Sequence, residues 1–278
     1  MKGIIFDIKE FALNDGDGIR TTIFLKGCPL RFVWCHNPEG LSAKPEIYVK
    51  SNGCLNCGLC HQKCDHEECQ PFGRCIHICP RNLVSISGEE WDSELLAEKL
   101  LRHAEFFKIS NGGITLSGGE PLFQAKFCLD LLKRLRGKIH RAIETSGYSN
   151  FDTFKETISE CDLVIMDIKL ADTQKHLEYT GGKNEYILKN AEHLKNSGIP
   201  HVFRIPLIPN ITDTEENLIG IASIVSESKT ELLPYNPLAS AKYKGVGRTF
   251  TDKIDESLAS KYDTAKLVSF FSNATVRK

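Results

Sequence analysis

Nine of the eleven cysteines in this 278-residue chain lie between Cys28 and Cys79, and their spacing constrains the fold more than any other feature. Four of the nine follow the pattern Cys-x2-Cys-x2-Cys-x3-Cys: Cys54, Cys57, Cys60 and Cys64. On a tight loop, the first three thiolates of such a pattern hold three irons of one 4Fe-4S cluster, and the fourth cysteine turns away to bind a neighbouring cluster. The pattern therefore predicts an iron-sulfur site.

The second half of this pattern is incomplete. Cys69, Cys75 and Cys79 follow the first four cysteines, and Phe72 stands where a full repeat has cysteine. In bacterial two-cluster ferredoxins, each half lends its last cysteine to the cluster of the other half. By that logic one cluster has a complete set of ligands: Cys54, Cys57, Cys60 and Cys79.

The remaining set has only three cysteines, Cys64, Cys69 and Cys75. We expect the second cluster to be three-ligated, to be completed by His66 or His77, or to be missing. A zinc ribbon is the alternative for the whole block, although zinc needs only four ligands, usually in two separated pairs.

The chain has no recognisable export or membrane signal. Its start, Met1–Asn14, mixes four charged residues with apolar ones, and no run of about 18 or more uncharged apolar residues occurs. Without export, clustered Cys-x2-Cys spacings favour reduced thiolates that hold metal over a disulfide framework. We expect a cytoplasmic protein that contacts no membrane.

The charges of the chain are balanced. The 35 basic and 36 acidic residues nearly cancel and form no long run of one sign. Such a balance offers no basic face for nucleic acid, so partners must be recognised by local surfaces. A hydrophobic content of 41% is enough for a substantial core, and we expect a monomer.

Outside the cysteine-rich block, short apolar runs alternate with amphipathic stretches. Strands are predicted at 21–26, 113–116, 140–144, 163–168, 201–207 and 231–233. Helices are predicted at 93–107, 123–135, 151–159, 185–197, 214–225 and 262–271. This alternation favours an α/β protein with a parallel sheet, and six units fit a partial (β/α)6 TIM-like barrel better than a complete one. A doubly wound open sheet is the alternative.

The predicted domains follow from this pattern. Residues 1–50 and 82–278 form the partial barrel, and residues 51–81 form a ferredoxin-like 4Fe-4S insertion. Polar motifs follow several predicted strands, at Cys28, Ser117, Glu144, Asp167 and Arg204. Barrels of this kind place cofactors at the carboxyl ends of their strands, so we expect these residues to converge on one site.

Three segments near the N-terminus resemble the signature of a known family. They are Asp15-Gly-Asp-Gly-Ile-Arg20, Lys26-Gly-Cys28-Pro-Leu-Arg31 and Trp34-Cys35-His-Asn-Pro-Glu39. Over nearly its whole length, the chain is similar to the glycyl-radical-enzyme activating enzymes. These are radical S-adenosylmethionine (SAM) proteins related to the pyruvate formate-lyase activating enzyme.

The resemblance implies a SAM-binding cluster held by three cysteines in the pattern Cys-x3-Cys-x2-Cys. The corresponding positions are Cys28, Phe32 and Cys35, so the middle ligand is absent. Phenylalanine has no lone pair, and we expect this cluster to be loosely held or not assembled. His36 and Asp15 are the possible substitutes, and neither is expected to reach the vacant iron.

The resemblance also implies the SAM-binding residues. The glycine-rich loop is expected to meet the amino group of SAM, Lys169 its carboxylate, and the acidic residues its sugar or a monovalent cation. The predicted cofactor-binding residues are Ser117, Gly118, Gly119, Glu120, Glu144, Thr145, Ser146, Asp167, Lys169, Arg204 and Asn236. A surface ion pair is the alternative for Asp167 and Lys169.

The implied reaction is reductive cleavage of SAM to a 5'-deoxyadenosyl radical, which takes a hydrogen atom from a glycine of a partner glycyl radical enzyme. The inserted clusters are expected to relay electrons from flavodoxin or ferredoxin under anaerobic conditions. Because Phe32 removes a cluster ligand, the alternative is a catalytically impaired iron-sulfur protein of the same fold, serving electron transfer or partner binding.

Overall fold

The computed structural model describes residues 1–50, 52–237, 239–251, 253–258 and 263–277. Its main sheet has nine strands in the order β11-β10-β9-β8-β7-β6-β2-β1-β5. Seven of them are mutually parallel: β2 (Arg20–Leu25), β6 (Gly113–Gly118), β7 (His140–Thr145), β8 (Leu163–Asp167), β9 (His201–Leu207), β10 (Thr230–Pro234) and β11 (Ala274–Val276). The six predicted strands are all present in this set.

The order of the parallel strands identifies the architecture. From β2 through β6 to β11 the order follows the sequence without reversal. Crossovers between parallel strands are almost always right-handed, so a series that advances in one direction puts its helices on one face and curls the sheet. A doubly wound sheet needs a reversal, and that alternative is wrong. The fold is a partial barrel, open between β11 and β5.

Two antiparallel strands extend the sheet beside β2. They are β1 (Lys2–Ala12) and β5 (Glu89–Asp92). Neither was predicted, because both carry several charged residues and are largely exposed or half-buried. Strand β1 pairs with β2 on one side and with β5 on the other. It thereby continues the sheet past the first parallel strand.

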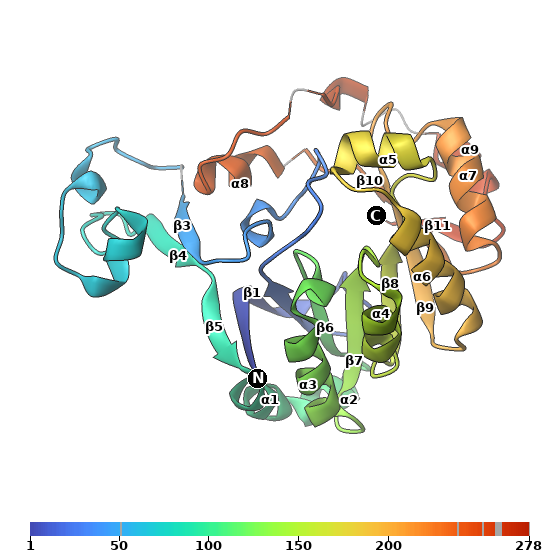
Figure 1. The fold of residues 1–278 in the computed structure, drawn as a ribbon, viewed down its shortest axis with the longest axis horizontal. Coiled ribbons are helices and arrows are strands. Elements are labelled where there is room, and N and C mark those ends of the chain that lie inside the picture. The colour runs from blue at the N-terminus through green and yellow to red at the C-terminus, as the bar shows by residue number, and fades with distance from the viewer. Residues whose placement is uncertain (51, 238, 252, 259–262, 278) are drawn as a thin grey trace.

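Most helices pack outside the curled sheet, whereas α5 and α8 lie above it in the view of Figure 1. They are α1 (Ser93–Leu101), α2 (Ala104–Ile109), α3 (Ala125–Leu135), α4 (Phe151–Ile158), α5 (Thr173–Thr180), α6 (Glu185–Asn196), α7 (Glu215–Val225), α8 (Ala239–Gly245) and α9 (Thr264–Ser269). Capping explains several starts: Asn150 accepts a hydrogen bond from the Thr153 amide, and Thr214 accepts one from Asn217. The buried residues of α3, including Phe127 and Leu131, lie at helical spacing against the sheet.

Two helix predictions differ from the structure. The stretch predicted as one helix over 93–107 is divided between α1 and α2. The last helix is shorter than predicted, running Thr264–Ser269, and the predicted start at Tyr262 lies outside the described residues.

The cysteine-rich segment projects from the barrel on a two-stranded neck. Strands β3 (Glu46–Val49) and β4 (Val84–Ser87) pair antiparallel, with Val49 opposite Val84. Beyond them the chain forms short 3-10 turns at Leu59–His61 and Glu67–Phe72. Figure 1 shows this arm at the left, away from the sheet. Among the described residues, no helix is long and apolar enough to cross a bilayer.

Candidate functional site

A pocket of about 250 Å³ opens at the carboxyl ends of the parallel strands. Most of the residues predicted to bind the cofactor line it together: Cys28, Cys35, Ser117, Gly118, Gly119, Glu120, Glu144, Thr145, Ser146, Asp167 and Lys169. They come from the ends of β6, β7 and β8 and from the loop after β2. Arg204 and Asn236 are not among the lining residues.

Cys28 and Cys35 are both buried beside this pocket. Burial raises the pKa of Cys28 to about 12 and that of Cys35 to about 11, so without a metal both are neutral thiols at pH 7. The Phe32 ring lines the same pocket. The site thus offers two thiols and an aromatic ring, which does not meet the three-thiolate requirement of the family's cluster.

The Phe32 ring has a cationic neighbour. The Lys169 ammonium lies 4.8 Å from the ring centroid and 2.9 Å from Asp167 Oδ2. Lys169 is 5% exposed, so its pair with Asp167 is not a surface ion pair. This arrangement places one cation in the pocket wall, between an aromatic face and a carboxylate.

Glu120 organises two loops of the pocket from within. Its Oε1 accepts from the Leu122 amide at 3.1 Å and from the Thr145 hydroxyl at 2.5 Å. Its Oε2 accepts from the Ser146 amide and hydroxyl, at 2.9 and 2.6 Å. Burial raises the pKa of Glu120 in spite of these four hydrogen bonds. In this structure the carboxylate holds the ends of β6 and β7 together.

The two glycines of the loop permit close backbone packing. Gly118 has φ +111°, which side-chain-bearing residues rarely adopt. A Cβ atom on Gly119 would lie 2.4 Å from the Gly27 carbonyl oxygen and 2.5 Å from that of Gly40. The loop after β6 therefore packs directly on the loop that carries Cys28.

Glu144, in the pocket wall, is held by one ion pair and one hydroxyl contact. The Arg204 guanidinium donates to Glu144 Oε1 at 2.6 Å, and the Ser117 hydroxyl donates to Oε2 at 2.6 Å. Burial alone would raise the pKa of Glu144, but Arg204 and Ser117 hold it below its usual value. Arg204 also donates to Glu231 and to the Asn14 carbonyl, so it supports Glu144 from behind.

The remaining predicted residues lie around this centre. His36 lines the pocket and makes a hydrogen bond to the backbone of Asn236, which places Asn236 next to the pocket wall. Asp15 is not among the lining residues, and its carboxylate accepts from the Thr22 hydroxyl at 2.5 Å. Asp15 is thus not a substitute ligand for Phe32.

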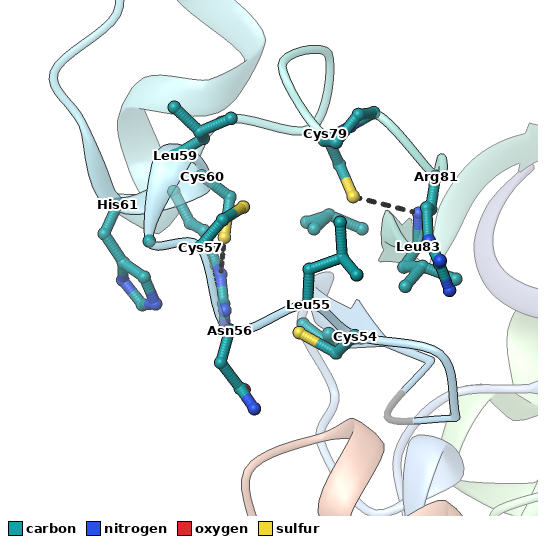
Figure 2. Close-up of a pocket in the computed structure, with 15 residues that line it drawn as sticks. Cys54, Leu55, Asn56, Cys57, Leu59, Cys60, His61, Cys79, Arg81 and Leu83 are labelled. Carbon is teal, nitrogen blue, oxygen red and sulfur yellow. Dashed lines mark hydrogen bonds between the residues drawn. The ribbon is translucent and has the colours of Figure 1, made fainter.

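A second cavity, of about 170 Å³, lies in the arm. It is lined by the four cysteines predicted for the complete cluster, Cys54, Cys57, Cys60 and Cys79 (Figure 2). The Leu83 amide donates to Cys79 Sγ at 3.5 Å, and Arg74 Nε donates to Cys60 Sγ at 3.2 Å. Hydrogen bonds of this kind stabilise thiolates that ligate iron. The four cysteines and the space between them fit a cubane.

The other three cysteines of the arm form a separate, tighter group with a histidine. The ligand atoms of Cys64, His66, Cys69 and Cys75 all lie within 4.8 Å of one another. Burial acts to raise the pKa of Cys75, but hydrogen bonds from the backbone amides of His77 and Ile78 outweigh it and bring the pKa to about 7.

Two contributors were not anticipated from the sequence. Arg74 donates to Cys60 Sγ from the opposite half of the arm. The Trp34 indole nitrogen is buried without a hydrogen-bond partner and lies beside the pocket that Trp34 helps to line. Trp34 belongs to the signature segment 34–39 but was given no role of its own, and the only sequence signal for Arg74 was its position near a cysteine.

Comparison with known proteins supports one family. The family described as "4Fe-4S single cluster domain" matches residues 14–189. The 4-hydroxyphenylacetate decarboxylase activating enzyme of Clostridioides difficile (strain 630) is 34% identical, over 92% of this chain and 89% of that protein. The isethionate sulfite-lyase activating enzyme of Oleidesulfovibrio alaskensis is 35% identical, over 90% and 87%.

Further comparisons agree with the fold. The (2S)-3-sulfopropanediol sulfolyase activating enzyme of Bilophila wadsworthia is 34% identical, over 89% of this chain and 90% of that protein. The crystal structure of Streptococcus suis SuiB bound to precursor peptide SuiA superposes with a TM-score of 0.57 at 12% identity, covering 94% of this chain and 49% of SuiB. That likeness supports the fold alone. The three sequence relatives, in contrast, are all activating enzymes. The chain belongs to the glycyl-radical-enzyme activating enzymes, a family of radical SAM oxidoreductases.

Proposed function

We propose that this protein binds SAM in the pocket at the ends of β6, β7 and β8 and acts on a glycine of a partner glycyl radical enzyme. The observation that carries this proposal is the convergence of Cys28, Cys35 and the loop 117–120 with Asp167 and Lys169 on one pocket. These residues come from three separate parts of the sequence. A fold that served only electron transfer has no need for that convergence.

The pocket residues have distinct tasks in this proposal. Lys169 is the cation for the carboxylate of SAM, since its ammonium is buried and lies at the pocket wall. Glu120 fixes the loop whose backbone faces the amino group, and Glu144 and Asp167 serve the sugar or a monovalent cation. Arg204 positions Glu144. Asn236, beside His36, lies on the side assigned to the adenosyl group.

The arm suggests how the protein obtains electrons and in which compartment it works. A 4Fe-4S cluster on Cys54, Cys57, Cys60 and Cys79 carries single electrons when bound, and we assign flavodoxin or ferredoxin as the donor. The protein is proposed to work as a monomer in the cytoplasm, where thiols stay reduced.

Phe32 supports a second candidate function. Two thiols and a ring do not provide the three ligands that the family's SAM-binding cluster needs, and the pocket gives Phe32 a cationic partner instead. A protein with this site could retain the arm cluster and the partner-binding surface while lacking efficient SAM cleavage. This reading treats the chain as an impaired member of the same family.

One experiment separates the two candidates. The full-length chain and Phe32→Cys are reconstituted anaerobically with iron and sulfide, and 5'-deoxyadenosine is measured after reduction in the presence of SAM. We expect Phe32→Cys to form it at least tenfold faster than the unaltered chain, because the variant restores the third thiolate. Equal rates would contradict the importance given to Phe32. No cleavage by either protein, with the extra iron bound to Phe32→Cys, would overturn the SAM-cleaving function.

A further inference from the structure

The group Cys64, His66, Cys69 and Cys75 in the arm is built differently from the cysteine set next to it. Cys69 and Cys75 are each 1% exposed, Cys64 is half-buried and His66 is exposed. His66 Nδ1 lies 3.8 Å from Cys75 Sγ. All four ligand atoms lie within 4.8 Å of one another. Three sulfurs and one imidazole nitrogen therefore face a common point.

These ligand atoms lie close enough together for a single ion to bind all four. Ligand atoms about 2.0–2.3 Å from one tetrahedral ion lie about 3.3–3.8 Å from each other. In a cubane each ligand binds a different iron, so the cluster itself stands between the sulfurs and holds them farther apart than the 4.8 Å limit of this group. The four cysteines of the other set instead surround a cavity of about 170 Å³.

The choice of His66 over His77 is also determined by contacts. The two rings are adjacent, with centroids 4.4 Å apart. His77 Nε2 is engaged by Glu68 Oε1 at 2.7 Å, on the exposed side of the arm. His66 has its Nδ1 turned toward Cys75. Of the two histidines left open by the sequence, His66 is the one in the ligand group.

Phe72 stands apart from this group. Its side chain lines a hollow with Ile47, Val49 and Gly245, between the arm and α8. The 3-10 turn that contains it begins after His66, whose carbonyl accepts from the Cys69 amide at 3.1 Å, and ends at Gly73 with φ +59°. This turn brings His66 to the cysteines and carries Phe72 away from them.

We propose that Cys64, His66, Cys69 and Cys75 bind one tetrahedral zinc ion in place of a second 4Fe-4S cluster. A Cys3His set is a common structural zinc site, and its three thiolates favour zinc over the harder divalent ions. The Ile76 amide donates to Cys69 Sγ at 3.5 Å and supports a thiolate ligand. This inference concerns the arm and does not depend on SAM cleavage.

The proposed ion has a structural role for the adjacent cluster. Cys75 is four residues before Cys79, and its amide donates to the Cys60 carbonyl at 2.9 Å, which joins the two halves of the arm. Zinc has no redox chemistry, so it takes no part in electron relay. It fixes the segment that presents Cys79 to the cavity shown in Figure 2. The arm thus holds one redox cluster and one structural ion.

The test measures metal content and the zinc environment in the full-length chain. The protein is purified anaerobically from medium that contains iron and zinc, and zinc, iron and sulfide are determined per chain. We expect about one zinc in the unaltered chain, with zinc K-edge absorption giving three sulfur ligands and one nitrogen. A second set of about four irons with no zinc would overturn the proposal. A single additional iron bound by the same three sulfurs and one nitrogen would overturn the choice of zinc.

Two variants test the role of His66. His66→Ala removes the proposed ligand, and His77→Ala is the matched control on the adjacent ring. In competition with a chromophoric chelator, we expect His66→Ala to hold zinc at least tenfold more weakly than the unaltered chain, and His77→Ala to be unchanged. Equal zinc affinity of the two variants would contradict the assignment of His66. Iron bound by the other set is measured in both variants to verify that the arm is folded.

Discussion

The barrel pocket and the arm each have a phenylalanine at a position where a cluster pattern has cysteine, and they accommodate it differently. In the arm, Phe72 lies outside the ligand group and His66 joins the three remaining cysteines. In the pocket, Phe32 stays in the wall with Cys28 and Cys35, and the Lys169 ammonium lies over its ring. One site has a fourth donor, and the other has an aromatic ring facing a cation.

The difference comes from the surroundings of each site. The arm is a polar loop of short turns, rich in histidine and held by few strands, so a neighbouring donor lies within reach. The pocket lies where strands end, and its loops are fixed by Glu120 and by close contacts of Gly119 with Gly27 and Gly40. A loop can exchange one ligand for another, whereas a packed strand end cannot.

The largest expected effect is a different loss of metal when a cysteine is removed from each of the two sites in the arm. Cys60→Ser should remove about four irons per chain and leave zinc in place, while Cys64→Ser should remove zinc and leave the iron, because the two residues belong to different ligand sets. Metal analysis after anaerobic purification measures both. Loss of about four irons from Cys64→Ser while that variant keeps its zinc would mean that Cys64 belongs to an iron cluster, and the contrast within the arm would fail.

Restoring each cysteine sharpens the contrast between the arm and the pocket. Phe32→Cys should gain about four irons per chain with zinc unchanged, since nothing else competes for Cys28 and Cys35. Phe72→Cys should gain about four irons only as zinc is lost, because both metals need Cys69 and Cys75. Iron and zinc are counted after reconstitution. Iron gained by Phe72→Cys without loss of zinc would contradict shared ligands.

A smaller effect is expected on stability when the hydrogen bonds of Glu120 in the pocket are weakened. Both oxygens of Glu120 accept a backbone amide, from Leu122 and from Ser146. A glutamine must turn its NH2 group toward one of these donors, so Glu120→Gln should lower the free energy of unfolding by about 3 kcal/mol. Urea unfolding of both proteins measures this difference in free energy. Glu156→Gln, whose side chain is 64% exposed, is the matched control and should change stability by less than about 0.5 kcal/mol.

The smallest expected effect is a pH dependence at Glu144. Arg204 and Ser117 hold the pKa of this carboxylate below its usual value against the effect of burial, so its ionised form stabilises the folded state. That stability is present above the usual pKa of about 4.5 and is lost as pH falls through the lower folded value. The stability difference between the unaltered chain and Glu144→Gln should therefore be constant near neutral pH and shrink below about pH 4.5. A difference independent of pH would contradict the ionic role.

The repeating parts of the fold were predictable, and the edge elements were not. Six strands were predicted because their apolar runs are buried and bounded by turns, as in β8. Strand β1 has four charged residues in its eleven and is stabilised by its neighbours β2 and β5. Helix α5 buries only His176 and Thr180, so it lacks an apolar stripe. Such elements depend on tertiary contacts that local pattern does not contain.

In the candidate sites, too, some features were predictable from the sequence and others depend on tertiary contacts. Spacing and resemblance assigned the pocket residues and the split of the arm cysteines. The sequence left His66 and His77 equivalent, because the decision rests on a turn that ends at Gly73 and on the contact between His77 and Glu68. Arg204 was expected at the cofactor, and its place behind Glu144 depends on Glu231 and the Asn14 carbonyl, both distant in sequence.

The β3–β4 neck has a consequence for how such a protein can evolve. The chain leaves the barrel through β3 at Glu46 and returns through β4 at Ser87, and these residues are direct partners in the ladder. Glu46 at the barrel end of the neck is anchored by Lys26 and Arg248, which belong to the barrel. A tight hairpin turn could therefore replace the entire arm without moving either end. The cysteine-rich arm is thus joined to the rest of the fold at one point only, so its length and ligand residues can change during evolution while the barrel stays the same.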